Sequence, residues 1–142
     1  MDGHPASSKW TLFEAFAQNI IQLAQSNRQQ WAQTAIFVTV DEGGGYYDSG
    51  FIQPVDFFGT GPRIPMIAVS PYSTGGHISH AYGEHSSFVK FVERNWKIHS
   101  TLSERSRDNL PNPEQRGHNE YVPSNMPAIG DLFDLFDFPH HG

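Results

Sequence analysis

A short β-prone run that ends in two carboxylates and three glycines constrains the fold of this chain most. Residues 34–40, with the sequence TAIFVTV, are mostly apolar and rich in β-branched side chains. This composition predicts a strand that is buried on both faces. Asp41 and Glu42 follow directly, and residues 43–45 are all glycine. Because open α/β sheets place their ligands at the carboxyl ends of strands, this strand end is the first candidate site.

One further strand and two helices are predicted around it. Residues 64–70 form a second buried strand that stops at Pro71. Residues 11–24 form a helix in which Thr11 and Glu14 have the spacing of a capping box. Its apolar side chains share one face: Phe13, Phe16, Ala17, Ile20, Ile21 and Ala24. Ser86 or Ser87 caps the next helix, whose inward residues are Phe88, Val89, Val92 and Trp96.

Helices that alternate with buried strands favour α/β layers with a mostly parallel sheet. Only two or three strands are visible, however, and a parallel sheet that is buried on both faces normally has more. We therefore expect an incomplete sheet whose other strands lie upstream. Residues 1–98 are assigned to this layered domain. Residues 99–142 form an irregular wrapping tail, in which residues 128–138 dock back as a short helix or turn.

Composition narrows the classes of function. The formal charge of −6, with nine Lys and Arg in 142 residues, argues against a protein that binds nucleic-acid phosphates. The lack of cysteine excludes disulfides and thiolate metal sites. No apolar run approaches the length that crosses a membrane, and the polar start MDGHP shows no signal peptide.

Asp41 and Glu42 are candidate metal ligands. Two adjacent carboxylates at a strand end repel each other unless a cation neutralises them, and hard oxygen ligands suit Mg²⁺, Ca²⁺ or Mn²⁺, with Zn²⁺ also compatible. A solvated strand end is an equally simple interpretation. A nucleotide-binding strand of the Walker B type is excluded, because the sequence has no Gly-x4-Gly-Lys-Ser/Thr loop.

Several histidines fall in predicted loops. His4 precedes the first helix, so the strand order can bring it near Asp41 at the same edge of the sheet. Three more follow the second strand, at positions 77, 80 and 85. Their spacing alone does not define a zinc site. Arg63 could hold a phosphate, although a surface arginine is the simpler interpretation.

The order of these motifs resembles the C-terminal half of the bacterial phosphoesterase family of phospholipases C and acid phosphatases. The resemblance covers nearly the whole chain. The matching segments are DGHP at 2–5, FVTVDEGGGYYD at 37–48, GPRIP at 61–65, VSPY at 69–72, GGH at 75–77, HSS at 85–87, FVERNW at 91–96 and RSRDNLP at 105–111. Many members read Trp-Asp-His after the glycines, whereas this chain has Tyr47-Asp48-Ser49.

The resemblance implies a three-layer α/β/α fold of the alkaline-phosphatase type. In such enzymes a Ser or Thr attacks phosphorus, a metal ion stabilises the developing charge, and histidines position oxygens or transfer protons. The family's acidic pair maps onto Asp41 and Glu42, with a divalent metal of unknown identity as cofactor. Its upstream active-site histidine maps onto His4. A downstream histidine of the wider superfamily is assigned to His85 in preference to His77 and His80.

The resemblance therefore implies hydrolysis of a phosphate ester, with phospholipids among the expected substrates, in a periplasmic or secreted enzyme. The family's nucleophile and Glu-Asn metal ligands correspond to sequence upstream of Met1. We therefore expect the chain to be a fragment that needs the upstream half of the domain and is inactive alone. The alternative is a non-catalytic α/β remnant that binds a cation or a partner.

Overall fold

The computed structural model describes residues 2–116 and 119–138, and its chain divides into two compact units. The first unit comprises residues 1–50 and 61–73, and the second comprises residues 51–60 and 74–142. The first unit carries α1 (Trp10–Ser26), α2 (Arg28–Trp31), β1 (Ile36–Thr39) and β2 (Met66–Val69). The second carries α3 (Ser86–Asn95) and the 3₁₀ turns η1 (Arg107–Asn109) and η2 (Phe133–Leu135). Each unit is described by itself. The predicted boundary between residues 98 and 99 stays a prediction.

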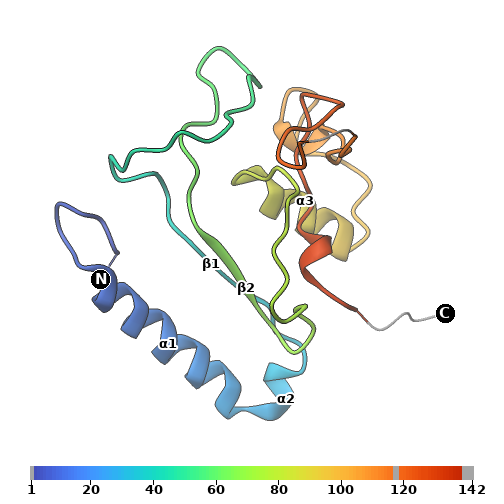
Figure 1. Ribbon diagram of the computed structural model, residues 1–142. Helices are drawn as coiled ribbons and strands as arrows, with labels where there is room; N and C mark the ends of the chain where they lie inside the picture. Colours follow the sequence, from blue (N-terminus) through green and yellow to red (C-terminus); the bar gives the residue numbers. More distant parts are fainter. Residues whose placement is uncertain (1, 117–118, 139–142) are drawn as a thin grey trace. The chain divides into compact units, whose positions relative to one another are not determined.

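Helix α1 is the longest regular element, and it leads into α2, which turns the chain towards β1 (Figure 1). Four residues of the predicted apolar face are half-buried: Phe13, Ala17, Ile21 and Ala24. The other two, Phe16 and Ile20, are exposed, so the prediction is wrong for them. The capping-box prediction is wrong. The helix begins at Trp10 and its N-cap is Lys9, so Thr11 already lies inside the first turn.

The two predicted strands form, but they pair antiparallel rather than as neighbours in a parallel sheet. Ile36 lies opposite Val69 and Thr39 lies opposite Met66. A parallel pair needs a crossover connection, usually a helix, to carry the chain back to the starting edge of the sheet. Residues 40–65 contain no helix, so the chain returns beside β1 in the opposite direction. The protein is mixed α/β, and the three-layer arrangement stays a prediction.

Both strands are half-buried rather than buried on two faces. Each β1 residue is only partly covered, and Ile67 of β2 keeps 59% of its surface exposed. Polar contacts fix one end of the pair, beyond Ile36 and Val69. The Ser70 hydroxyl donates to the Thr34 carbonyl at 2.9 Å, and the Tyr72 hydroxyl donates to the Ala32 carbonyl at 3.0 Å. The apolar runs therefore correctly predict strands but overestimate how deeply they are buried.

The core of the second unit is built by α3 and the C-terminal segment. Phe91 packs against Phe133 and Phe136, with ring centroids 5.1 and 5.4 Å apart. Ala128 and Ile129 of this segment are fully buried. The inward face of α3 differs from the prediction, because its buried residues are Ser87 and Phe91.

Two side chains predicted to point inward from α3 lie at the surface. Val92 is 45% exposed and Trp96 is 65% exposed. The phenylalanines of the C-terminal segment cover the face around Phe91, which leaves Val92 and Trp96 on another side of the helix. The helix also starts after His85, which serves as N-cap without a side-chain hydrogen bond, rather than after Ser86 or Ser87.

A buried glutamine joins the loop of residues 51–60 to the C-terminal segment of the same unit. Gln53 is fully buried; its Nε2 donates to the Ala128 carbonyl at 2.7 Å and its Oε1 accepts from the Ala128 amide at 2.6 Å. The backbone amide of Gln53 also donates to the Tyr82 hydroxyl at 3.0 Å. These bonds satisfy the polar groups of a side chain that would otherwise be costly to bury.

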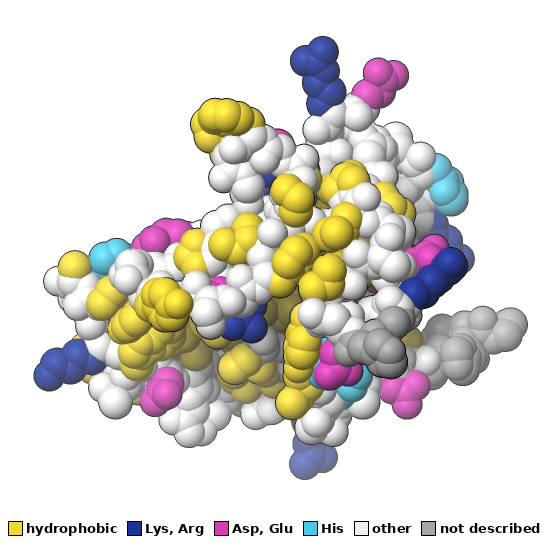
Figure 2. Space-filling model, turned by 45° about the horizontal axis from the view of Figure 1, so that its top comes forward, with side chains coloured by type: hydrophobic (Ala, Val, Ile, Leu, Met, Phe, Trp, Pro, Cys, Tyr) yellow, Lys and Arg dark blue, Asp and Glu magenta, His cyan; other side chains and the backbone are white. Residues whose placement is uncertain are grey.

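Much apolar surface remains exposed in the described chain. Figure 2 shows several separate groups of hydrophobic side chains on the face that it draws. Along α1 the exposed large side chains are Leu12, Phe16, Ile20 and Leu23. None of the helices among residues 2–116 and 119–138 is long and apolar enough to cross a membrane.

Candidate active site

A cavity of about 570 Å³ lies at the carboxyl end of β1 within the first unit. Its wall combines the loop before α1, the strand end and the start of β2. It is lined by residues 2–7, Trp10, residues 40–44, Tyr46 and residues 63–65. His4, Asp41 and Glu42 therefore share one cavity, which is the placement expected for the carboxyl end of a strand.

The three glycines after Glu42 form a tight turn that shapes this cavity. Gly44 and Gly45 both have positive φ, at 62° and 79°, and the Tyr46 amide donates to the Gly43 carbonyl at 3.1 Å. Two successive positive φ angles favour glycine strongly. A Cβ atom on Gly44 would also lie 2.9 Å from the Pro5 ring. The turn therefore depends on glycine for its backbone angles and for its close approach to Pro5.

The same turn orients the Glu42 carboxylate. The Gly44 amide donates to Glu42 Oε2 at 2.7 Å, which leaves Oε1 directed towards the imidazole of His4. Glu42 Oε1 lies 3.4 Å from His4 Nε2. One carboxylate oxygen is thus held by the backbone, while the other faces the histidine.

His4 is held by its own loop. The Asp2 carboxylate accepts the His4 amide at 3.0 Å, and this bond lowers the pKa of Asp2. His4 Nδ1 accepts the Ala6 amide at 3.1 Å, so the proton of a neutral imidazole lies on Nε2, facing Glu42. The side chains of His4 and Glu42 are 43% and 55% exposed, so water screens their attraction. The site is open to a ligand from solvent.

Asp41 and Glu42 are exposed. Water can solvate both carboxylates, so the repulsion between them does not by itself require a cation. Among residues 2–116 and 119–138, no group of three or more His, Asp or Glu side chains lies close enough to hold a metal ion. The oxygen donors suit a hard divalent cation. The described residues therefore supply at most part of a metal site, and metal binding stays a prediction.

Arg63 is paired rather than free to hold a phosphate. Its Nη2 and Nε donate to Asp48 Oδ1 at 2.6 and 3.0 Å, and its amide donates to Asp48 Oδ2 at 2.7 Å. These bonds, with one from the Gly50 amide, hold the pKa of Asp48 far below its usual value. No sequence pattern predicts this pair, since the two residues lie fifteen positions apart in irregular loops. Both residues belong to the first unit, and Arg63 lines the cavity.

The Asp48–Arg63 pair predicts a pH dependence of stability. Because the pKa of Asp48 is lowered on folding, its contribution is complete above the unfolded value near 3.8 and is lost as the pH falls below that value. Asp48→Asn should therefore flatten the fall in unfolding free energy below about pH 4. Chemical denaturation between pH 7 and pH 2.5 measures this. Glu104→Gln, at an exposed site, serves as the control, and equal pH dependence in wild type and Asp48→Asn would contradict the prediction.

A sequence model of the phosphoesterase family matches residues 1–99, which include every residue of this cavity. The chain belongs to the phosphoesterase family. This confirms the resemblance drawn from the motifs.

Relatives of the family match over most of the chain. Hemolytic phospholipase C of Pseudomonas aeruginosa is 28% identical over 91% of this chain and 18% of its own length. Non-hemolytic phospholipase C of Burkholderia pseudomallei is 26% identical over 87% of this chain and 19% of its own length. Phospholipase C B of Mycobacterium tuberculosis is 24% identical over 83% of this chain and 24% of its own length. The chain thus spans about a fifth of the length of these relatives. No solved structure matches it.

The three downstream histidines belong to the second unit. His85 is exposed at the N-cap of α3, and His77 is exposed in the preceding loop. His80 Nδ1 lies 2.7 Å from the Glu120 carboxylate, and its ring stacks on Tyr121. His80 thus already has a structural partner. The family role assigned to His85 stays a prediction.

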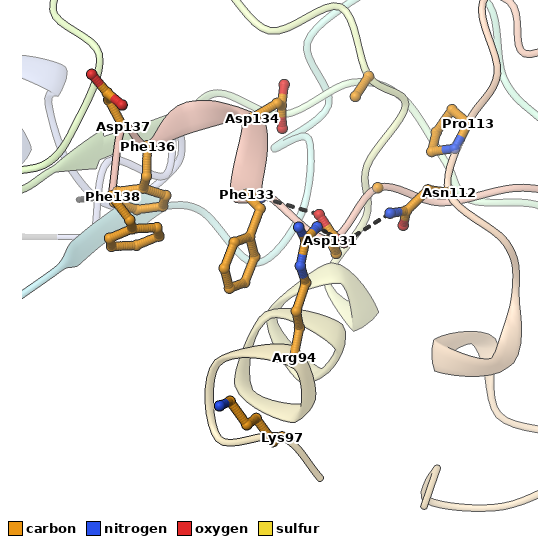
Figure 3. Close-up of a pocket in the computed structure, with 12 residues that line it drawn as sticks. Arg94, Lys97, Asn112, Pro113, Asp131, Phe133, Asp134, Phe136, Asp137 and Phe138 are labelled. Atoms are coloured by element: carbon orange, nitrogen blue, oxygen red, sulfur yellow. Dashed lines mark hydrogen bonds and ion pairs between the residues drawn. The ribbon is translucent and has the colours of Figure 1, made fainter. Parts of the chain in front are cut away.

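A second cavity, of about 790 Å³, lies beside α3 in the second unit (Figure 3). Arg94 donates to Asp131 at 2.6 Å and lies 4.1 Å from the centre of the Phe133 ring. Asn112 donates to the same carboxylate at 2.8 Å. Arg94 and Asp131 therefore neutralise each other in this cavity, and their ion pair joins α3 to the C-terminal segment.

Proposed function

We propose that this chain forms part of the catalytic site of a metal-dependent phosphoester hydrolase that acts on phospholipids or similar phosphate esters. The observation that carries the proposal is the placement of His4 Nε2 3.4 Å from Glu42 Oε1, in one cavity with Asp41. The match of residues 1–99 to the phosphoesterase family supports it. The names of the relatives support phospholipids as the substrate class.

His4 positions the phosphoryl group in this proposal. With Nδ1 accepting the Ala6 amide, a neutral ring carries its proton on Nε2 inside the cavity, where it can donate a hydrogen bond to a phosphoryl oxygen. Glu42 orients the ring, because its own position is held by the Gly44 amide. In this proposal the nucleophile is not a residue of this chain.

Asp41 and Glu42 provide the oxygen donors for a divalent cation. Such a cation, when bound, would neutralise charge on the phosphoryl oxygens. Phosphate oxygens, water or groups outside the described residues must complete its coordination, since these residues bring together no three ligands. That shortage favours a second candidate, a non-catalytic protein that binds a cation or partner weakly.

A substrate panel separates the two candidates. Turnover of p-nitrophenyl phosphate and p-nitrophenyl phosphorylcholine should be measured in the full-length protein before and after chelator treatment, and again after adding back Mg²⁺, Mn²⁺, Ca²⁺ or Zn²⁺. We expect turnover that the chelator abolishes and one cation restores. Cation binding by calorimetry without turnover of either ester would favour the non-catalytic candidate.

A further inference from the structure

The loop of residues 51–60 (green in Figure 1) is held rigidly at its base. Gln53 forms its buried pair with Ala128, and the Thr60 and Tyr82 hydroxyls lie 2.7 Å apart. Phe51 packs edge-on against Tyr82, with ring centroids 6.0 Å apart. Both ends of the loop are therefore fixed on the second unit, so the loop presents its tip in a defined position.

The tip itself consists of two almost fully exposed aromatic side chains. Phe57 is 95% exposed and Phe58 is 90% exposed, and their rings lie edge to face with centroids 5.3 Å apart. Asp56 Oδ1 accepts the amides of Phe58 and Gly59 at 2.9 and 3.0 Å, which fixes the turn. Exposing two adjacent phenylalanines on a fixed turn is unfavourable, because contact between apolar side chains and water raises the free energy.

The tip also lacks an unpaired charge. Asp56 is the single charged residue in the sequence of residues 50–62, and its carboxylate forms an ion pair with Arg107. Arg107 binds Glu84 as well, at 2.6 Å. Two carboxylates share one arginine there, so the tip has no excess of positive charge and suits an electrically neutral, zwitterionic surface better than an anionic one, which would attract basic side chains.

We propose that Phe57 and Phe58 form a docking tip that inserts into the surface of a zwitterionic phospholipid bilayer. This inference rests on the proposed function, in which the substrate is a phospholipid. The small contact area of the tip favours lipid rather than protein as its partner. Two phenylalanines bury roughly 300–500 Å² together, whereas a stable protein interface buries about 800 Å² on each partner. A bilayer needs no complementary surface, so two side chains suffice for reversible binding.

Sedimentation with sucrose-loaded phosphatidylcholine vesicles tests the tip in the full chain. Replacing both residues with serine should weaken partitioning about 100-fold, since each buried phenylalanine contributes about tenfold. Ile78→Ser with Leu102→Ser is the matched control, because these side chains are 75% and 73% exposed elsewhere in the same unit. The control should change partitioning less than twofold.

A fluorescent probe gives a second readout. The chain has no cysteine, so Phe58→Cys can be labelled at a single site with a polarity-sensitive dye. A blue shift on adding vesicles is expected, with none for dye on Thr101→Cys.

Unchanged partitioning in the serine pair overturns the proposal. The proposal is also overturned if the wild-type chain does not bind vesicles but sediments as a dimer, and if the serine pair is monomeric. In that case Phe57 and Phe58 contact a second copy of the chain rather than lipid.

Turnover of p-nitrophenyl phosphorylcholine, a soluble ester, is measured in parallel with the same substitutions made in the full-length protein. The serine pair should hydrolyse this ester normally, because Phe57 and Phe58 are not among the residues that line the cavity of His4 and Glu42. Absence of turnover in the wild type contradicts the proposed function, while vesicle partitioning still decides the role of the tip.

Discussion

Replacing Glu42 with alanine is expected to lower turnover of a p-nitrophenyl phosphate ester by about 10²–10³-fold, the usual cost of removing one preorganised electrostatic group from an active site. The substitution removes the carboxylate that faces His4 and an oxygen donor for the cation. Asp41→Ala should cause a loss of similar size if Asp41 is also a ligand. The assay uses the full-length protein, with metal content measured by atomic emission.

A third variant, Glu42→Gln, separates the loss of metal binding from the loss of the turn that orients Glu42 towards His4. Glu42→Gln retains an acceptor for the Gly44 amide but weakens a cation ligand, so it should lose metal while the turn persists. Glu14→Ala, at an exposed position on α1, is the control and should retain full turnover. Normal metal content and near-normal turnover in both Asp41→Ala and Glu42→Ala would remove the acidic pair from the site.

Replacing Gln53 with alanine is expected to lower the free energy of unfolding by about 3–5 kcal/mol. The Ala128 amide and carbonyl would both lose their partners inside the second unit, at about 1–3 kcal/mol for each unpaired group, and a cavity would remain. Denaturant unfolding followed by circular dichroism measures the loss. An effect below about 1 kcal/mol would show that the pair does not hold the loop.

Two further variants separate the causes of that loss. Gln53→Leu fills most of the volume without the polar groups, so its cost measures the unpaired backbone of Ala128 alone. Gln18→Ala removes a glutamine from an exposed position on α1 and should change stability by less than about 0.5 kcal/mol.

Local sequence patterns predicted the helices and strands better than the segments with which they pair and pack. The apolar run before Asp41 correctly predicts β1, and the spacing from Phe13 to Ala24 correctly predicts a helix, of whose six assigned face residues four are half-buried. Strand direction was wrong, because it depends on whether the connection contains a helix, and residues 40–65 do not form one.

Contacts between distant loops were beyond the reach of sequence patterns. The motifs brought His4 and the acidic pair to the same strand end, which the structure also does. The Asp48–Arg63 pair and the Gln53–Ala128 pair join irregular segments that have no periodicity to detect. The inward face of α3 was misassigned for the same reason, because the covering phenylalanines lie about forty residues downstream.

The interleaving of the two units has a consequence for synthesis on the ribosome. Gln53 emerges long before its partner, since Ala128 follows 75 residues later, and residues 61–73 of the first unit are made in between. Translation at about 5–20 residues per second separates the two by roughly 4–15 seconds. The first unit can close as soon as residue 73 is free, while the loop that carries Phe57 and Phe58 waits without its anchor. A chaperone that binds nascent aromatic segments would find this loop available for that interval.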